Sequence, residues 1–258
     1  MEIKKTHIYL ASDSTVQSYD EIYYPQTGWG QVIIDFLNHG DFIEVSQAKS
    51  CSYSLAKRYE TKKVVIENRS IGGRSSRSFL EEGKFDELLQ VLDKGDYLFV
   101  QFGHNDATIE RPNRYVSVED FPLYIQKYID ACSEKEATCV LVTPVARRNC
   151  DENKGEFKIS FAAYRDAMIK ISAEQNIPLL DLGYHSYEYL KTLGVNKSKE
   201  LYMWLEPNEY PDGAYKEGLK DNTHLSRKGA LIYANILVEL IRNYNKDSKL
   251  DSIKKLIP

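Results

Sequence analysis

Five short apolar runs, each continuous rather than alternating, constrain the fold of this 258-residue chain more than any other feature. The runs occupy residues 8–11, 64–66, 97–100, 139–142 and 178–182. A strand that is buried on both faces has an unbroken apolar sequence, which is typical of parallel sheets covered by helices on both sides. The runs therefore predict a parallel sheet in the interior of the protein.

Helical periodicities lie between these runs. Apolar residues recur at helical spacing from Trp29, Phe85, Phe121 and Phe161 onwards. A last segment, residues 230–241, is apolar almost all round, so we expect a buried helix there, with Ser226 as a suitable N-cap. Strands that alternate with helices indicate βαβ units, an α/β fold class and a three-layer α/β/α sandwich.

We expect one domain over residues 1–258, because the chain has no internal repeat and no linker-like stretch. Two segments are longer than ordinary connections. For residues 38–63 we expect a helix around 54–60. For residues 195–224 we expect an ordered functional loop.

Composition excludes several classes of protein. The chain has 34 Lys and Arg against 38 Asp and Glu, a net charge of −4, which argues against nucleic acid or an anionic membrane as a partner. No stretch approaches the ~18–20 apolar residues of a membrane span. The N-terminus has no apolar core of a signal peptide, so we expect a cytoplasmic protein with four reduced cysteines.

Cofactor motifs are also missing from the sequence. The five histidines form no HExxH or other close ligand pair, so we expect no metal site. Neither a GxGxxG motif nor a P-loop is present, so nucleotide binding by those motifs is not supported. We therefore expect a protein that works without a cofactor.

Four polar clusters fall where a site should form. Ligands of open parallel sheets bind beyond the carboxyl ends of the strands. Residues 12–15, 68–75 and 103–106 follow the first three apolar runs, and residues 221–224 precede the last helix. Their coincidence at these positions predicts a functional site at that edge of the sheet.

The residue types in these clusters suit acyl transfer. A serine such as Ser14 needs a base to take its proton, and His224 is of the type that does so near neutral pH. Asp221, three residues earlier, could hold the imidazole in the required tautomer. Backbone N–H groups at Ser14 and at a glycine, together with an asparagine amide, would stabilise the oxyanion, each donor contributing about 3–4 kcal/mol in the transition state.

These motifs resemble those of the SGNH (GDSL-type) hydrolase superfamily, and most of all its rhamnogalacturonan acetylesterase branch. The segments that carry the resemblance are LASDSTV at 10–16, NRSIGGRSSRSF at 68–79, QFGHND at 101–106 and DNTHLSRKG at 221–229. The resemblance implies a flavodoxin-like fold with a five-stranded parallel sheet of order 2-1-3-4-5.

The resemblance also assigns roles to particular residues. Ser14 would be the nucleophile, His224 the general base and Asp221 the residue that orients it. The Ser14 N–H, the Gly73 N–H and the Asn105 side chain would form the oxyanion hole. The branch's glycine directly precedes an Arg-Ser pair, which favours Gly73 over Gly72.

One position departs from the family pattern. Ser12 stands where the first block usually has glycine. If that position required a positive φ, a serine would cost about 1 kcal/mol. We expect the change to be harmless, because Asp13 and Ser14 are intact.

Candidate substrate contacts are aromatic and basic. Trp204, Tyr202 and Tyr210 precede the Asp–His pair, and aromatic faces suit sugar stacking, although ordinary packing would account for them too. Arg74 follows the second strand, and a guanidinium binds the carboxylates of pectic substrates well. Surface ion pairing is the alternative for Arg74, and also for Arg77, Arg147 and Arg148.

The sequence thus predicts a serine esterase, a carbohydrate O-acetylesterase that removes acetyl groups from plant cell-wall oligosaccharides such as rhamnogalacturonan, pectin or xylan fragments. Its partner would be the acetylated oligosaccharide, and the sequence does not indicate an oligomeric state. Two alternatives stay open at this point: a short-chain or lipid-type esterase of the same superfamily, and a catalytically silent glycan-binding protein on this fold.

Overall fold

The computed structural model describes residues 5–258, whose strands form one large sheet and two hairpins. The large sheet has the order β2-β3-β4-β1-β5-β6-β9. Its strands are β1 (Thr6–Ala11), β2 (Glu44–Gln47), β3 (Lys57–Glu60), β4 (Val64–Asn68), β5 (Tyr97–Val100), β6 (Thr138–Val142) and β9 (Leu179–Leu180). The hairpins are β7 (Cys150–Asp151) with β8 (Glu156–Phe157), and β10 (Tyr202–Leu205) with β11 (Leu219–Leu225).

The five strands β4-β1-β5-β6-β9 run parallel, and each overlaps one of the predicted apolar runs. Ile8 in the central strand β1 pairs with Ile66 on one side and Tyr97 on the other. In chain order this is the predicted arrangement 2-1-3-4-5. The α/β fold class is therefore confirmed, and all five carboxyl ends lie at one edge of the sheet.

Two further strands were not predicted. β3 pairs antiparallel with β4, and β2 pairs antiparallel with β3, so the sheet has seven strands rather than five. The helix expected around residues 54–60 is wrong, since Lys57–Glu60 forms β3. The cause of this strand lies in the tertiary structure. Arg58 donates to the buried carboxylate of Glu67 in β4 (2.9 Å), and the periodicity of the local sequence does not predict that contact.

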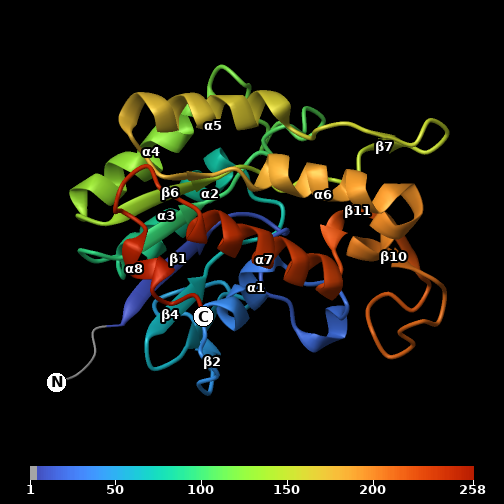
Figure 1. Ribbon diagram of the computed structural model, residues 1–258, viewed down its shortest axis with the longest axis horizontal. Coiled ribbons are helices and arrows are strands. Elements are labelled where there is room, and N and C mark those ends of the chain that lie inside the picture. Colours follow the sequence, from blue (N-terminus) through green and yellow to red (C-terminus); the bar gives the residue numbers. More distant parts are fainter. Residues whose placement is uncertain (1–4) are drawn as a thin grey trace.

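Helices cover both faces of the sheet, as Figure 1 makes visible. The α-helices are α1 (Trp29–Val32), α2 (Ser76–Glu81), α3 (Lys84–Leu89), α4 (Phe121–Glu134), α5 (Ala162–Gln175), α6 (Leu182–Lys197), α7 (Arg227–Arg242) and α8 (Asp251–Lys254). Short 3₁₀ helices are η1 (Glu21–Tyr23), η2 (Ile33–Phe36) and η3 (Ser198–Leu201). One core packs α1, α6, α7 and α8 on the first face, and a second core packs α2 to α5 on the other. Because Ile8 and Leu10 face the first core while Tyr9 and Ala11 face the second, β1 is buried on both sides.

The other predicted helices are present, and α7 begins as expected with the Ser226 hydroxyl accepting from Gly229 N (3.1 Å). The segment 195–224 is more regular than the predicted loop, because it contains η3, β10 and β11.

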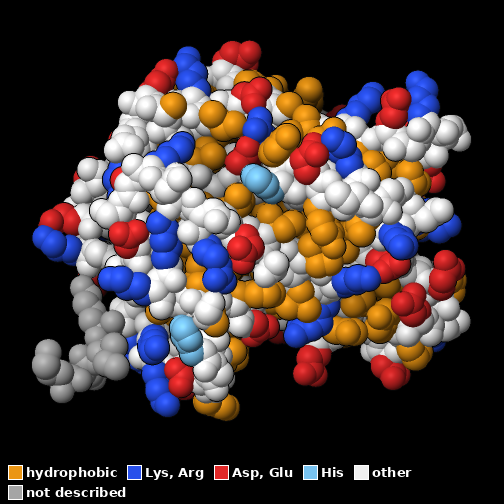
Figure 2. Space-filling model, viewed as in Figure 1, with side chains coloured by type: hydrophobic (Ala, Val, Ile, Leu, Met, Phe, Trp, Pro, Cys, Tyr) orange, Lys and Arg blue, Asp and Glu red, His pale blue; other side chains and the backbone are white. Residues whose placement is uncertain are grey.

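On the face in Figure 2, acidic and basic side chains are interspersed. Among residues 5–258, no helix is long and apolar enough to cross a membrane.

Candidate active site

Three of the four predicted polar clusters emerge side by side from the adjacent strands β4, β1 and β5. Hydrogen bonds connect the loops that follow these strands. Ile71 N donates to Ser12 O (3.0 Å), and Ser76 N donates to Asp106 Oδ1 (3.0 Å). The three loops therefore form one connected surface, which we call the sheet edge and define by Ser14, Gly73 and Asn105.

Ser14 lies in a tight turn directly after β1. The N–H groups of Val16 and Gln17 both donate to Asp13 O (3.2 and 3.1 Å), and Asp13 Oδ1 accepts from Thr15 N (2.9 Å). The neighbours of Ser14 on both sides are buried, whereas Ser14 itself is partly exposed. The turn thus fixes the backbone and leaves the Ser14 side chain accessible.

Ser12 is accommodated without backbone strain. It is not among the described residues with positive φ, so the position does not require glycine. Its buried hydroxyl donates to Gln101 O (2.5 Å), which links β1 to the segment after β5.

The Gly72–Gly73 turn lies against Ser14. A Cβ atom placed on Gly72 would be 3.5 Å from Ser14 Cβ. Gly73 has φ +80°, a conformation that favours glycine. Gly72 N donates to Gln17 Oε1 (2.5 Å), whereas Gly73 N and Ser14 N have no hydrogen-bond partner in the described part of the chain. Two free N–H groups therefore flank the accessible serine.

Asn105 is held in place by the residue that follows it. Asp106 is fully buried and accepts from Gly103 N (3.0 Å) as well as from Ser76, so it ties the loop after β5 to the start of α2. Burial raises the pKa of the Asp106 carboxyl to about 7. Asn105 Nδ2 donates to Arg74 O (2.8 Å), and its second N–H is available to a ligand.

Asp221 and His224 are paired on β11. The imidazole Nδ1 of His224 lies 2.7 Å from Asp221 Oδ2, and the N–H groups of Thr223 and His224 donate to Asp221 Oδ1 (2.6 and 3.0 Å). Burial raises the pKa of the Asp221 carboxyl, but the hydrogen bond and charge of His224 and these N–H donors lower it by more, so it lies below its usual value. An ionised Asp221 holds a proton on Nδ1 and leaves Nε2 as the basic nitrogen.

A second histidine, His104, is unsuited to act as a base. Its Nε2 lies 2.9 Å from Val145 O, and since a carbonyl can only accept, Nε2 carries the proton. The ring is buried and packs on Phe161 with 4.4 Å between centroids. Burial lowers the pKa of His104, so the ring stays neutral and internal.

The segment Gln26–Trp29 connects the hairpin to the Ser14 turn. Thr27 N donates to Leu225 O (3.0 Å), next to His224, and Trp29 N donates to Thr15 O (3.0 Å), next to Ser14. The structure therefore brings the fourth cluster to the sheet edge. Within the described chain, no hydrogen bond joins the Ser14 hydroxyl to His224, and such contacts are often loose before substrate binds.

Residues 11–237 match the family described as GDSL-like Lipase/Acylhydrolase, which covers every residue of this site. The chain belongs to that family. It is accordingly an esterase, and the SGNH resemblance seen in its motifs is confirmed.

Named relatives and solved structures agree with this assignment. The chain is 34% identical over 236 residues to rhamnogalacturonan acetylesterase RhgT of Bacillus subtilis, covering 92% of this chain and 89% of that protein. It is 35% identical over 237 residues to the probable rhamnogalacturonan acetylesterase YesY of the same organism, covering 92% of each. The crystal structure of Axe2, an acetylxylan esterase from Geobacillus stearothermophilus, superposes with a TM-score of 0.60 at 14% identity, covering 95% of this chain and 98% of that one. This last similarity shows the fold.

Two of the residues predicted to contact the substrate of this esterase, Tyr202 and Trp204, make contacts within the protein. Tyr202 is 1% exposed, and its hydroxyl donates to Ala146 O (2.7 Å), so the expectation that it contacts substrate is wrong. Trp204 donates from Nε1 to Asn222 Oδ1 (2.8 Å), and its ring packs against the cations of Arg148 and Lys199 at 5.1 and 4.4 Å. These contacts give Trp204 a structural role on the hairpin.

Arg74 and Tyr210 stay predicted substrate contacts, and their surroundings differ. The Arg74 guanidinium donates to Glu82 Oε2 (2.9 Å), so its charge is already neutralised. Tyr210 is partly exposed and packs edge-on against Tyr24, with 5.5 Å between ring centroids. Both residues keep exposed surface, since Tyr210 is partly exposed and the Arg74 side chain is 34% exposed.

Two supporting residues of the esterase, Gln17 and Asn222, were missed at the level of sequence. Gln17 Oε1 accepts from Gly72 N and from the Tyr53 hydroxyl (2.8 Å), which fixes the glycine turn beside Ser14. Arg148 is buried and donates to Asn222 Oδ1 (3.1 Å), which fixes the strand between Asp221 and His224. Proximity to a motif was the one available signal, since Gln17 is three residues from Ser14 and Asn222 lies inside the last cluster.

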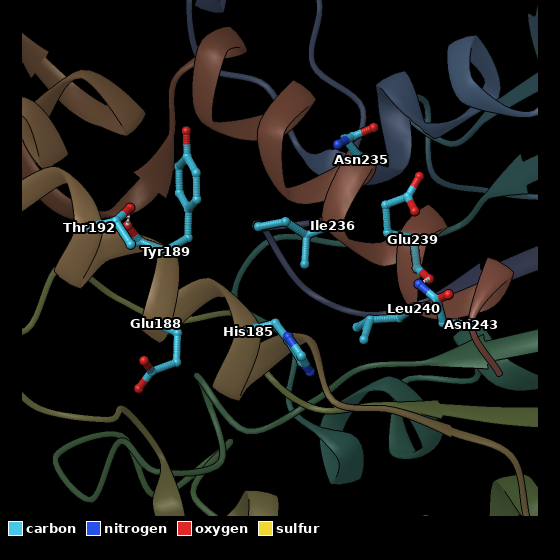
Figure 3. A pocket seen from close by; sticks show the side chains of 9 residues that line it. All are labelled: His185, Glu188, Tyr189, Thr192, Asn235, Ile236, Glu239, Leu240 and Asn243. Atoms are coloured by element: carbon cyan, nitrogen blue, oxygen red, sulfur yellow. Dashed lines mark hydrogen bonds between the residues drawn. The ribbon is translucent and has the colours of Figure 1, made fainter.

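Other features lie away from this centre. Among residues 5–258, no three His, Cys, Asp or Glu side chains are grouped so that they could hold a metal ion. A cavity of about 410 Å³ opens between α6 and α7 (Figure 3), where His185, Tyr189, Ile236 and Leu240 line it. None of the predicted site residues lines that cavity.

Proposed function

We propose that this esterase is a carbohydrate O-acetylesterase that acts on acetylated plant cell-wall oligosaccharides, with Ser14 as nucleophile, His224 as general base and Asp221 as the residue that orients it. The names of its relatives support an acetyl ester on a plant polysaccharide, since they include rhamnogalacturonan acetylesterases and an acetylxylan esterase. The observation that carries the proposal is the partly exposed Ser14 beside the N–H groups of Ser14 and Gly73, which have no hydrogen-bond partner among residues 5–258, together with the Asp221–His224 pair on the hairpin.

The reaction follows from these positions. His224 Nε2 takes the proton of Ser14 Oγ while that oxygen bonds to the acetyl carbonyl carbon. The oxyanion accepts hydrogen bonds from Ser14 N, Gly73 N and Asn105 Nδ2, each donor being worth about 3–4 kcal/mol to the transition state. The bond between the carbonyl carbon and the sugar oxygen then breaks, and His224 returns the proton to that oxygen.

The second half of the reaction releases acetate. Water, deprotonated by His224, attacks the acetyl-Ser14 ester and forms a second oxyanion in the same hole. This intermediate collapses to acetate, and the proton returns from His224 to Ser14 Oγ. Asp221 stays ionised throughout and stabilises the imidazolium that forms in each half.

The test is acetate release from a panel of acetylated rhamnogalacturonan, pectin and xylan oligosaccharides, with wild type and Ser14→Ala side by side. We expect release by wild type and a loss of at least about 10³-fold in the variant. Hydrolysis of p-nitrophenyl octanoate in preference to the acetate would instead identify a lipid-type esterase. The cytoplasmic location expected from the sequence stays a prediction, which cell fractionation would test.

A further inference from the structure

Two neighbouring segments bring five tyrosines together beside the proposed active site. One segment, residues 19–26, follows the Ser14 turn, and the other, residues 206–218, connects β10 to β11. Ala214 N donates to Ile22 O (2.7 Å), which holds the two segments together. In the described chain, none of the five belongs to either hydrophobic core, so packing of the interior does not account for them. The five are Tyr19, Tyr23, Tyr24, Tyr210 and Tyr215.

Three of these rings connect the two halves of the proposed catalytic centre. The Tyr19 hydroxyl donates to Ser14 O (2.8 Å), and the Tyr19 ring packs edge-on against Tyr23 with 6.1 Å between centroids. Tyr23 in turn packs against Tyr215, with 6.5 Å between centroids. Burial, and then the charges of Tyr23 and Asp221, raise the pKa of Tyr215 to about 12. The rings therefore extend from the nucleophile turn towards the Asp221 carboxylate.

The outer side of this group is open to solvent. Ile22, Tyr23 and Tyr24 are 57%, 38% and 48% exposed, and among residues 5–258 no other three consecutive large apolar side chains are all exposed. Tyr24 packs edge-on against the partly exposed Tyr210, so the surface continues onto the second segment. A contiguous exposed apolar patch is typical of a binding surface. We call Tyr23, Tyr24 and Tyr210 the tyrosine platform.

The residue types favour a sugar as the occupant of the platform. A phenol ring presents an apolar face and a hydroxyl group, and a pyranose ring offers the same two kinds of surface, whereas an acyl chain offers only the first. Glu21 and Glu209 border the platform, and neither has a cationic partner in the described part of the chain. Burial and the charge of Glu209 raise the pKa of Tyr210, so this acid is close to the ring. Acidic neighbours disfavour an anionic lipid surface.

We propose that the tyrosine platform binds a sugar unit remote from the acetylated one and makes the esterase prefer long over short oligosaccharides. When the acetyl ester is at Ser14, the rest of the sugar chain leaves the centre across one of its borders. The rings that begin at Tyr19 provide an apolar border there, which is continuous with the proposed active site. This inference rests on the proposed acetylesterase function and adds to it the length of chain that the protein recognises.

The experiment measures kcat/KM for acetate release from fragments of two and six sugar units with equal acetylation, prepared from rhamnogalacturonan and from xylan. The length preference is the six-unit value divided by the two-unit value, and it should exceed one for wild type. Tyr24→Ala and Tyr210→Ala should each lower it by about 3- to 10-fold, the value of one aromatic contact. Tyr24→Phe keeps the ring and should retain most of the preference.

A matched variant and a second readout define the control. Tyr184 on α6 is 42% exposed and contacts Arg165, so Tyr184→Ala removes an equally exposed tyrosine outside the platform and should keep the wild-type length preference. Calorimetry with Ser14→Ala measures binding of an unacetylated six-unit fragment without turnover. Adding Tyr24→Ala to that protein should weaken the affinity by the same factor as it lowers the length preference.

A wild-type length preference of one, or an unchanged preference in both Tyr24→Ala and Tyr210→Ala, would overturn the platform. An acyl-chain surface would give another result, in which these variants lower hydrolysis of p-nitrophenyl octanoate relative to the acetate and leave the length preference unchanged. Failure of the parent proposal has its own signature, since wild type would then release acetate from neither kind of fragment.

Discussion

The sheet edge and the β10–β11 hairpin contribute to the same proposed site but are built differently. At the sheet edge, Ser14, Gly73 and Asn105 sit on turns that leave three adjacent parallel strands, so sheet topology positions them. The hairpin lies outside the large sheet, and the His224 side chain is 34% exposed. Its place depends on a few contacts, among them Thr27 N with Leu225 O and Arg148 N with Asn222 O (2.8 Å). We therefore expect the oxyanion donors to be held rigidly by the sheet. The alignment of His224 should depend on the few contacts that hold the hairpin.

The largest expected effect tests whether the two regions act as one unit. Ser14→Ala and His224→Ala should each lower kcat for p-nitrophenyl acetate by on the order of 10⁴-fold, and the double variant should cost no more than either alone. Urea unfolding of each variant serves as the control for folding. If the double variant lost the product of the two single effects, the two side chains would work independently.

A second change acts on the sheet edge alone. Gly73→Ala puts a Cβ at φ +80° and 3.1 Å from Arg114 Nη1, so it should displace the proposed N–H donor and lower kcat by about 10- to 100-fold. Gly72→Ala is the matched comparison, because Gly72 has no positive φ and its N–H already serves Gln17. A larger loss of kcat in Gly72→Ala would move the oxyanion role to that residue.

A third change acts on the hairpin alone. Asn222→Ala removes the oxygen that accepts from both Arg148 and Trp204, so β11 should lose its fixed position and kcat should fall by about 10-fold through misalignment of His224. Asn222→Asp keeps an acceptor there and should retain more activity. Equal losses of kcat in both variants would show that these hydrogen bonds do not align the base.

A smaller effect is expected where the chain departs from its family. Ser12→Gly restores the usual residue but removes the bond from Ser12 Oγ to Gln101 O, so the free energy of unfolding should fall by about 1–2 kcal/mol. The kcat should stay at the wild-type value, because Ser12 has no positive φ to relieve. A rise in kcat would mean that the serine misdirects Ser14.

The smallest effect concerns pH. Because the pKa of Asp221 is lower in the folded protein than in the unfolded chain, its contribution to stability is present above about pH 4 and is lost as pH falls through the folded value. Between about pH 5 and pH 3, wild type should therefore lose more stability than Asp221→Asn. Asp212→Asn, on the exposed part of the same hairpin, should follow wild type. Parallel curves for wild type and Asp221→Asn would contradict the shift.

The two regions also differ in how far sequence could predict them. The parallel strands were predictable because burial on both faces leaves an unbroken apolar pattern, and the Ser14, Gly73 and Asn105 motifs follow these strands directly. β11 carries no such pattern, since only Leu219 and Leu225 in it are apolar. β11 forms a strand because β10 pairs with it, and the spacing of apolar residues in β11 does not predict that pairing.

Contacts between distant residues decide the surroundings of the aromatic side chains that precede the Asp–His pair. Tyr202 is buried because it meets Tyr233, whose hydroxyl lies 2.9 Å away on α7. Three cations from separate segments lie near the Trp204 ring, and Arg148 is one of them. Proximity to a motif predicts a substrate contact for all three aromatic residues, and only the tertiary structure shows that Tyr202 is buried whereas Trp204 and Tyr210 are partly exposed.

The placement of the two tryptophans gives each region its own intrinsic fluorophore. Trp29 is 1% exposed beneath the sheet edge and donates to Gln101 Oε1 (3.1 Å), while Trp204 is partly exposed on the hairpin among cations. Their surroundings differ in polarity, so their emission maxima should be separable. Replacing either one by Phe would leave a single tryptophan, through which release of the hairpin and melting of the sheet could be recorded as separate events.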